Sequence, residues 1–480
     1  MIRKLKIFSN PDKNIIFLKR VVKVQEKVVQ LSSFFAFGIL LFHLGYSIDP
    51  QDQVTTSSLF NIFLILIGFG YLVRVLLVEK SIFPARVILE LLLSVILILT
   101  ALVRWNVFGE EMSILILEFT AHYHLVNGLV ITLFFIELSK FSLTINELKL
   151  SPSLVFIMSF VFLILVGTGL LSLPEATNRD ITLIDALFTS TSAVCVTGLI
   201  VLDTAKDFTF FGQVVIMILF QIGGLGIMVF TSFFGFFFKG SYTLENRLFI
   251  RDYINENNVN EIYSTLFKII SFTILVEGFC AFLIYHFIDS AQFTGRGDQL
   301  FFSLFHAISA FCNAGFSTLS NGLYEEGFRE AYNMHLTISL AIILGGIGFP
   351  VVLNYYSYLK HVARGQARSL LGIEKYRHAS RVSSVNTRLV VYTTGILLLI
   401  GMVVYWISEQ DATLKGLSPY GKFATTIFGA VTPRTAGFNT VDMRQLAVPT
   451  ILIYLFLMWI GASPGSTGGG LKTSTFAVAM

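Results

Sequence analysis

The chain has 480 residues, of which 54% are hydrophobic and 13% are charged. Soluble globular domains are about 45–50% apolar and about 25% charged, so this composition excludes that class and indicates an all-α polytopic membrane protein. A net charge of +4 is too small to indicate a nucleic-acid partner. The three cysteines lie in or beside apolar runs and do not indicate a disulfide framework.

Several apolar segments are long enough to cross a bilayer, which takes about 20 helical residues. Basic residues gather before the first segment, after residue 238 and after residue 357, on one side if each long segment crosses once. Positive charge marks the cytoplasmic side, so we expect a multi-pass protein of the plasma (inner) membrane with a cytoplasmic N-terminus. The predicted spans are residues 29–47, 58–78, 84–104, 115–137, 153–173, 209–238, 264–288, 334–357, 386–407 and 446–461 onward.

Three shorter apolar stretches each lie between two long ones. Residues 181–194, 298–312 and 419–431 are below the length of a span, so they are predicted to be re-entrant half-helices that enter from the outer side. A glycine motif follows each stretch, and the motifs recur about every 120 residues, which indicates an internal repeat. The motif glycines are Gly198, Gly315 and Gly437.

A second glycine cluster follows each motif inside the next long helix. The clusters begin at Gly223, Gly345 and Gly461, and the third expands into the stretch SPGSTGGGLKTST. This stretch is close to a phosphate-binding loop, but Lys472 comes one place late and an apolar helix rather than a strand precedes it. Its place in the repeat favours a helix glycine cluster over a nucleotide site.

The pattern of long helix, half-helix, glycine strand and long helix is how a potassium filter is built. Glycine lets a short strand turn its carbonyls toward a bare cation, and the half-helix directs its negative C-terminal end at the same place. Glycine used only for helix packing is the alternative for any single motif. The residues predicted to supply the coordinating carbonyls are Val196, Thr197, Gly198, Asn313, Ala314, Gly315, Thr435, Ala436 and Gly437.

The motifs VTGL, CNAGFS, RTAGFNT and SPGSTGGGLKT together resemble those of the Trk/Ktr/HKT family of potassium-uptake proteins, over residues 150 to 480. The resemblance implies K⁺ uptake through a carbonyl-lined filter, and Gly198, where some plant members have serine, favours K⁺ over Na⁺. It also implies a homodimer in the lipid bilayer, a cytosolic nucleotide-binding ring as partner, and no cofactor beyond the transported K⁺, with Na⁺ coupling left open.

The glycine-rich stretch resembles the intramembrane gate of this family. Helix 446 onward would still be inside the membrane at Gly461, so we expect the loop to break the helix beneath the filter. Hydroxyl groups of Ser463, Ser466 and Thr467 are expected to satisfy the freed backbone groups. The predicted gating residues are Gly461, Ser463, Gly465, Ser466, Thr467, Gly468, Gly469 and Gly470.

A four-sided filter needs a fourth segment, and we expect the fourth repeat to be absent from these 480 residues. The chain is interpreted as a fragment of a longer product, with a fourth segment from another polypeptide as the alternative. A non-conducting structural or regulatory subunit, or an inactive fragment, is therefore the alternative function. The expected domains are a cytosolic basic arm at 1–28, an extra four-helix transmembrane module at 29–150, and repeats at 151–240, 263–358 and 385–480.

Three other features leave alternatives open. Arg434 either repels cations or ties the filter to its surroundings, and the second role is favoured because a bare cation opposes conduction. Asp185 either raises the local cation concentration or caps its own helix. An enzyme is not expected, because the histidines are scattered and the G-x-S-x-G sequence at Gly461–Gly465 lacks the strand that a nucleophile elbow requires.

Overall fold

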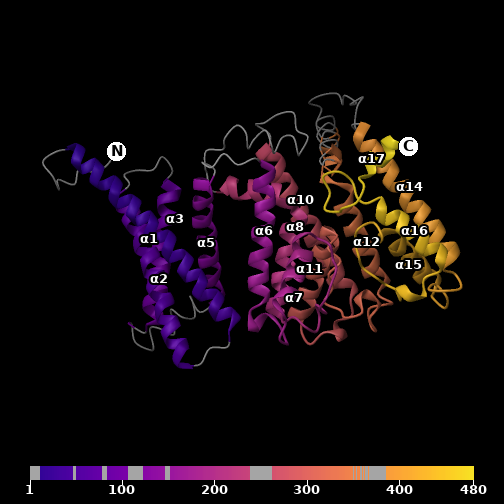
Figure 1. The fold of residues 1–480 in the computed structure, drawn as a ribbon, viewed down its shortest axis with the longest axis horizontal. Helices are drawn as coiled ribbons and strands as arrows, with labels where there is room; N and C mark the ends of the chain where they lie inside the picture. The colour runs from indigo at the N-terminus through magenta and orange to yellow at the C-terminus, as the bar shows by residue number, and fades with distance from the viewer. Residues whose placement is uncertain are drawn as a thin grey trace. The chain divides into compact units, whose positions relative to one another are not determined.

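The computed structural model describes residues 11–46, 50–77, 84–105, 107, 123–145, 152–237, 262–349, 351–352, 354–356, 359–360, 362, 366 and 385–480. These residues are helical apart from connecting loops and one isolated bridge between Thr177 and Phe208. They form two compact units, one before and one after residue 150 (Figure 1). The all-α fold class predicted from composition is confirmed.

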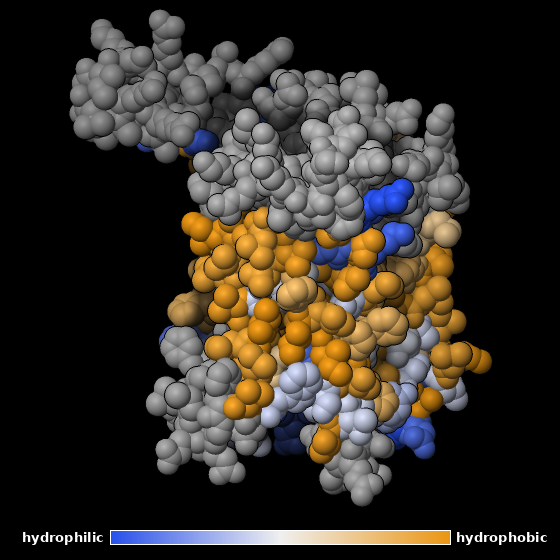
Figure 2. All heavy atoms as spheres, turned by 90° about the vertical axis from the view of Figure 1, so that its left-hand side faces the viewer, coloured by the Kyte–Doolittle hydropathy of each residue, from blue (hydrophilic) through white to orange (hydrophobic). Residues whose placement is uncertain are grey.

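Within its described residues, the first unit contains four long helices around a hydrophobic core. Leu64, Ile67 and Val130 are completely buried there. On the face shown in Figure 2, hydrophobic side chains form a broad band across the middle, as a lipid-facing surface requires. The helices are α1 (Pro11–Gly45), α2 (Pro50–Leu77), α3 (Pro84–Arg104) and α5 (Tyr123–Ile145).

The second unit repeats a long helix, a short helix and a second helix, which has 28 residues in the first set but only 16 and 12 in the other two. This order follows the alternation of long and short apolar segments in the sequence, although the predicted domain boundaries stay a prediction. The first set is α6 (Pro152–Leu171), α7 (Leu183–Val194) and α8 (Phe210–Phe237). The others are α10 (Ile262–Phe287), α11 (Arg296–Cys312) and α12 (Tyr332–Ile347), and α14 (Val385–Ser408), α15 (Pro419–Val431) and α16 (Val448–Trp459), with α17 (Thr473–Ala479) last.

Within the described residues, five helices are long and apolar enough to cross a membrane by length and composition. Shorter apolar helices include most of the remaining predicted spans. The multi-pass character of the protein is thus confirmed, whereas predicted residues 115–122 lie outside the described part. The five segments are Arg20–Gly45, Val54–Leu76, Val87–Arg104, Phe267–Phe287 and Thr387–Ser408.

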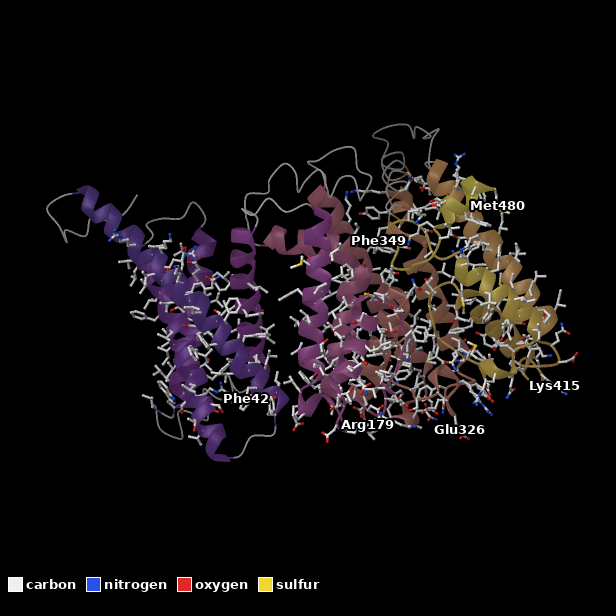
Figure 3. The ribbon with its side chains drawn as sticks, in the orientation of Figure 1. Phe42, Arg179, Glu326, Phe349, Lys415 and Met480 are labelled. Carbon is white, nitrogen blue, oxygen red and sulfur yellow. The ribbon has the colours of Figure 1, made fainter. Side chains whose placement is uncertain are left out.

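The short helices α7, α11 and α15 have 12, 17 and 13 residues. At 1.5 Å per residue they are about 18–26 Å long, less than the roughly 30 Å of a bilayer core. Arg179 and Lys415, which precede short helices, lie at the same end of the unit as Glu326, which follows one (Figure 3). Each short helix and the strand after it therefore enter and leave from one end, as re-entrant segments do.

Local sequence explains where the short helices begin. Thr182 and Asp185 form a capping box at the start of α7, in which the Thr182 hydroxyl accepts from Asp185 N and the Asp185 carboxylate accepts from Thr182 N. Ser418 caps α15 by accepting a 3.0 Å hydrogen bond from Gly421 N. Of the two roles left open for Asp185, the capping role is the one that these contacts support.

The second helix of each set is interrupted toward its C-terminal end. Gly226 inside α8 has φ 73° and ψ 155°, and Gly348 ends α12 with φ 92° and ψ 140°. The continuous spans predicted at 209–238 and 334–357 therefore each contain a break. The reason is the third glycine of each cluster, which adopts a left-handed conformation that ends an α-helix.

The N-terminal end of α16 is held by a buried carboxylate. Glu409, completely buried at the end of α14, accepts a 2.9 Å hydrogen bond from Ala447 N and a further bond from the Thr450 hydroxyl. Its other oxygen accepts a 2.8 Å bond from the Thr413 hydroxyl. Because the carboxylate caps a helix N-terminus with several donors, its burial is compensated.

Candidate functional site

The three predicted filter segments, Val196–Gly198, Asn313–Gly315 and Thr435–Gly437, share one backbone pattern. Each begins with a non-glycine residue at positive φ and ends with a glycine at positive φ, and the middle residue is not positive. Among the described residues, no other non-glycine has positive φ. The φ angles are 54° at Val196, 57° at Asn313 and 67° at Thr435, and 75° at Gly198, 72° at Gly315 and 81° at Gly437.

This conformation is costly for the first residue of each segment. A left-handed residue with a Cβ costs roughly 1–2 kcal/mol, and such strain gathers at functional sites. Alternating the sign of φ cancels the helical turn, so that successive carbonyls can face the same side. A strained backbone repeated three times in register is therefore more specific than glycine used for packing.

The structure brings the three segments together in chain order. A Cβ added to Gly198 would lie 2.4 Å from the carbonyl oxygen of Ala314, and one added to Gly315 would lie 2.8 Å from that of Ala436. The Cβ position of Gly437 is 3.3 Å from the Cα of Gly315. The second segment thus contacts both the first and the third, and side chains at the glycines would displace their neighbours.

The first glycine of each of the first two clusters supports the short helix behind its filter segment. A Cβ on Gly223 would lie 2.0 Å from the carbonyl oxygen of Val194, at the end of α7. A Cβ on Gly345 would lie 1.9 Å from that of Phe311, near the end of α11. Only glycine therefore allows α8 and α12 to pack against the C-terminal ends of the short helices.

Those C-terminal ends carry the partial negative charge of the helix dipole. Each of α7, α11 and α15 ends within four residues of the start of a filter segment, and the three segments are in mutual contact, so three negative helix ends lie near one region. Such an arrangement favours a cation and disfavours an anion. Within the described residues, no group of three or more His, Cys, Asp or Glu side chains could hold a metal ion.

Side-chain hydroxyls fix the residue that follows each of the last two filter glycines. Ser309 on α11 donates a 2.7 Å hydrogen bond to the carbonyl oxygen of Phe316. Thr432 at the end of α15 makes the corresponding bond to the carbonyl oxygen of Phe438. These bonds hold the C-terminal end of the second and third segments against their own half-helices.

His306 on α11 has the role of a hydrogen-bonded structural side chain. Its Nδ1 lies 2.9 Å from the carbonyl oxygen of Phe302, and its Nε2 lies 2.9 Å from the hydroxyl of Ser317. The ring is completely buried. Since Ser317 comes two residues after Gly315, His306 orients the strand that leaves the second filter segment.

The predicted gating residues form a compact glycine-rich loop, residues 460–472, between α16 and α17. Leu471 N donates to Trp459 O at 3.1 Å, and Ala462 N donates to Gly469 O at 3.1 Å. The loop therefore closes on itself below the last turn of α16. The backbone of α16 is therefore broken where the sequence predicted, after Trp459.

The glycine-rich loop is also bonded to the break at the end of α12. Ser463 N donates a 3.0 Å hydrogen bond to Gly346 O, and Phe349 N donates a 3.0 Å bond to Gly465 O. Backbone groups freed by two broken helices thus satisfy one another, which makes irregular backbone tolerable inside a membrane.

Two residues of the loop contact filter segments directly. Thr467 Oγ1 accepts a 2.8 Å hydrogen bond from the Asn313 side-chain amide and donates a 3.0 Å bond to Phe311 O. A Cβ on Gly468 would lie 2.4 Å from the Thr435 hydroxyl oxygen. The loop therefore lies against the start of the second and third segments, and its assignment as a gate stays a prediction.

The predicted hydroxyl contacts differ in detail. Ser466 donates a 2.6 Å bond to Ser463 O, and Thr467 bonds Phe311 O, so these two satisfy backbone carbonyls. The Ser463 hydroxyl instead lies 3.2 Å from that of Thr473, because the loop carries it toward the start of α17. Two of the three hydroxyls therefore bond backbone groups.

Lys472 bears on the nucleotide alternative. Its ammonium donates a 2.7 Å hydrogen bond to Gly468 O, within the loop itself. A phosphate-binding lysine needs its donors directed at a ligand, and the loop follows a helix rather than a strand. Both observations weigh against a phosphate site.

Arg434 directly precedes the third filter segment and is 8% exposed. Its guanidinium donates a 3.1 Å hydrogen bond to Gly461 O, at the first residue of the predicted gating set. The side chain thus ties the filter to the point where α16 ends. This contact supports the favoured of the two roles considered for Arg434.

Sequence reasoning missed Glu277 and Gln221. Glu277 lies in the middle of the apolar helix α10, and Gln221 on α8 donates a 3.0 Å hydrogen bond to its carboxylate. A lone carboxylate within an apolar 26-residue helix is itself a signal of function in a membrane protein.

Comparison with known proteins assigns the chain to a family. The family model for TrkH, a cation transport protein, matches residues 121–480. The chain belongs to the TrkH family of cation transport proteins. The Trk/Ktr resemblance drawn from the motifs is confirmed, and the N-terminal helices α1, α2 and α3 precede the part that matches.

Several curated relatives of this TrkH-family chain span much of its length. The Ktr system potassium uptake protein B of Bacillus subtilis is 36% identical over 338 residues, which are 70% of this chain and 71% of the relative. The protein of the same name from Vibrio alginolyticus is 33% identical over 68% of each chain. The potassium/sodium uptake protein NtpJ of Enterococcus hirae is 33% identical over 69% of each.

Among solved structures, the potassium transporter TrkH from Vibrio parahaemolyticus is similar, with 19% sequence identity and a TM-score of 0.48. The match covers 87% of this chain and 72% of that one.

Proposed function

We propose that this chain is a pore-forming subunit for K⁺ uptake across the plasma (inner) membrane, with its N-terminus in the cytosol. The observation that carries the proposal is the set of three strained segments in mutual contact, each at the negative end of a half-helix. Carbonyls arranged in this way replace the hydration shell of a K⁺ ion. The potassium uptake activity named for the 33–36% identical relatives supports the choice of ion.

Gating by the glycine-rich loop belongs to the same proposal. The loop lies against Asn313 and Thr435, at the inner end of two filter segments, so it obstructs the ion path until it moves. We further propose a homodimer in the bilayer and regulation by a cytosolic nucleotide-binding ring, as the family resemblance implies. Uptake measured with and without external Na⁺ tests whether K⁺ uptake is coupled to Na⁺.

The test is K⁺ and Rb⁺ uptake by the complete gene product in a bacterial strain that lacks its own K⁺ uptake. Uptake should appear with the wild-type protein and fall about tenfold or more in Gly315→Ser, because strain and overlap with Ala436 O together exceed about 1.4 kcal/mol. Gly416→Ala is the matched control, since Gly416 has φ 80° but lies in an open loop before α15.

Two outcomes contradict the proposal. Absence of uptake with protein present in the membrane would favour the non-conducting subunit. Normal uptake and selectivity in Gly315→Ser would show that the segment is no filter.

A further inference from the structure

A chain of polar side chains lies behind the second filter segment. Cys312, the last residue of α11, donates from its thiol a 3.1 Å hydrogen bond to Oε1 of Gln221 on α8. The amide of Gln221 donates a 3.0 Å bond to Oε2 of Glu277 on α10. Three helices from two successive repeats therefore meet at the residue that precedes Asn313.

The surface of α8 is shaped for this contact. Gln221 and Gly224 are three residues apart and so share one face of the helix. A Cβ on Gly224 would lie 2.6 Å from the sulfur of Cys312. Glycine thus lets α8 lie directly against the thiol, which brings the Gln221 amide within hydrogen-bonding distance of it.

Packing alone does not account for Glu277. The side chain is 5% exposed and its Oε1 has no hydrogen-bond partner within the described residues. Burying a carboxyl group in a membrane helix is expensive, and an apolar side chain of similar volume would fill the space at lower cost. The one bond that Glu277 makes orients Gln221, and Gln221 in turn fixes Cys312.

The corresponding position of the third repeat is held by a different device. Arg434 directly precedes the third filter segment, as Cys312 precedes the second, and its guanidinium is bonded to Gly461 O. In both repeats a hydrogen bond therefore ties the residue before the strained segment to another element: Cys312 to α8, and Arg434 to the loop that follows α16. Two unrelated side chains at one register position indicate that the position needs to be fixed.

We propose that Glu277 and Gln221 are positioning residues that hold the second filter segment through Cys312 and thereby set the preference for K⁺ over Na⁺. The inference rests on the proposed function of that segment. A filter distinguishes these ions by the number and placement of its carbonyls, so a small displacement of Asn313 lowers discrimination before it lowers flux. Neither residue touches the ion.

The transport experiment compares the complete gene product with Gln221→Leu and Glu277→Leu in the uptake-deficient strain. Each variant should raise the apparent KM for K⁺ and the inhibition by Na⁺ about tenfold, the loss expected for one buried hydrogen bond, with a smaller change in maximal rate. Thr273→Val is the matched control: it removes another buried polar group of α10, one turn away from Glu277, and should behave as wild type.

An exchange variant separates positioning from general destabilisation. In Gln221→Glu combined with Glu277→Gln, a carboxylate on α8 still accepts from Cys312 and also from the new amide on α10. Selectivity should return to within about threefold of wild type, whereas Gln221→Glu alone places two carboxylates face to face and should not recover. A purely structural loss would not be repaired by exchanging the two groups.

A second readout does not depend on transport. In a protein with Cys195→Ser and Cys280→Ser, Cys312 is the remaining thiol of these 480 residues. Its alkylation by a membrane-permeant maleimide should be slow in this parent protein. With Gln221→Leu added, alkylation should be about tenfold faster, because the thiol loses the Gln221 oxygen as its hydrogen-bond acceptor. If the wild-type protein shows no uptake, the proposed function fails. The labelling still tests whether Gln221 holds Cys312.

Two results overturn the inference. One is a wild-type protein that prefers K⁺ while Gln221→Leu and Glu277→Leu match it in KM and Na⁺ inhibition. The other is an alkylation rate at Cys312 that Gln221→Leu leaves unchanged.

Discussion

The side-chain amide of Asn313 donates a 2.8 Å hydrogen bond to the hydroxyl of Thr467, 154 residues later in the sequence. The same hydroxyl donates to Phe311 O at 3.0 Å. A single threonine thus joins the glycine-rich loop to both the half-helix and the strained segment above it. Movement of the loop breaks these two bonds, so Thr467 acts as a latch in the proposed gate.

Replacing Thr467 with valine should favour the open loop. The isosteric substitution removes both side-chain bonds, each with a net value of about 1 kcal/mol, and should raise K⁺ flux on the order of tenfold. Rb⁺ uptake under conditions where the wild-type protein is largely closed measures the effect. Ser466→Ala, which removes a bond internal to the loop, should change flux much less; equal effects of the two variants would refute the latch.

Gly345→Ala should destabilise the fold. The new Cβ would lie 1.9 Å from Phe311 O, so α12 has to move away from α11, at a cost of about 1–3 kcal/mol. The thermal unfolding midpoint in detergent should fall by several degrees. Gly278→Ala on α10, where a Cβ meets open space, should leave the midpoint unchanged or raise it slightly. Matching midpoints for the two variants would contradict the close packing.

Substitution of Arg434 tests whether this residue anchors the third filter segment to Gly461 or acts as an electrostatic barrier to cations. Arg434→Gln loses the charge-assisted bond to Gly461 O, worth about 1.5–3 kcal/mol, and should lower both thermal stability and K⁺ uptake. Arg434→Lys keeps one charged donor and should retain more of both. A barrier predicts the reverse for Arg434→Gln, namely tighter K⁺ binding, so the half-saturating K⁺ concentration decides between them.

Acid should weaken the connection between the third filter segment and α16. The backbone N–H of Arg444, assisted by its side chain, holds the pKa of the Asp442 carboxyl below its usual value. A lowered pKa in the folded state contributes stability above the unfolded pKa of about 3.9, and this contribution is lost as the pH falls further. Unfolding midpoints between pH 7 and 3 should therefore fall at the acid end less steeply for Asp442→Asn than for wild type. Asp411→Asn, in the loop after α14, is the control, and parallel curves for wild type and Asp442→Asn would contradict this role.

Much of this architecture is encoded locally. In the sequence, the length of the apolar segments separates the stretches that form α7, α11 and α15 from their neighbours, although α12 and α16 are as short in the structure because their segments are broken at glycine. The recurrence of Gly198, Gly315 and Gly437 about every 120 residues identifies the repeat. The interruption of α16 was also predictable, because Gly, Ser and Pro are poor helix formers.

Other features depend on contacts that no local pattern specifies. Gly226 and Gly348 look like ordinary helix glycines until their positive φ angles are known. The contacts of Gln221 with Glu277 and Cys312 span 56 and 91 residues, so a sequence gives each residue without its partner. The one clue in the sequence was the carboxylate of Glu277 within an apolar helix. Its role depends on which helix faces it, and only the structure shows that this is α8.

The capping of α16 by Glu409 has a mechanical consequence. The carboxylate holds Ala447 N and Thr450 at the N-terminal end of the helix, while the C-terminal end runs into a loop joined to its surroundings by separate hydrogen bonds. The two ends of α16 are therefore anchored independently. If the loop moves as proposed, displacement is expected to be confined to the stretch between Trp459 and Thr473, with the N-terminal end of α16 left in place.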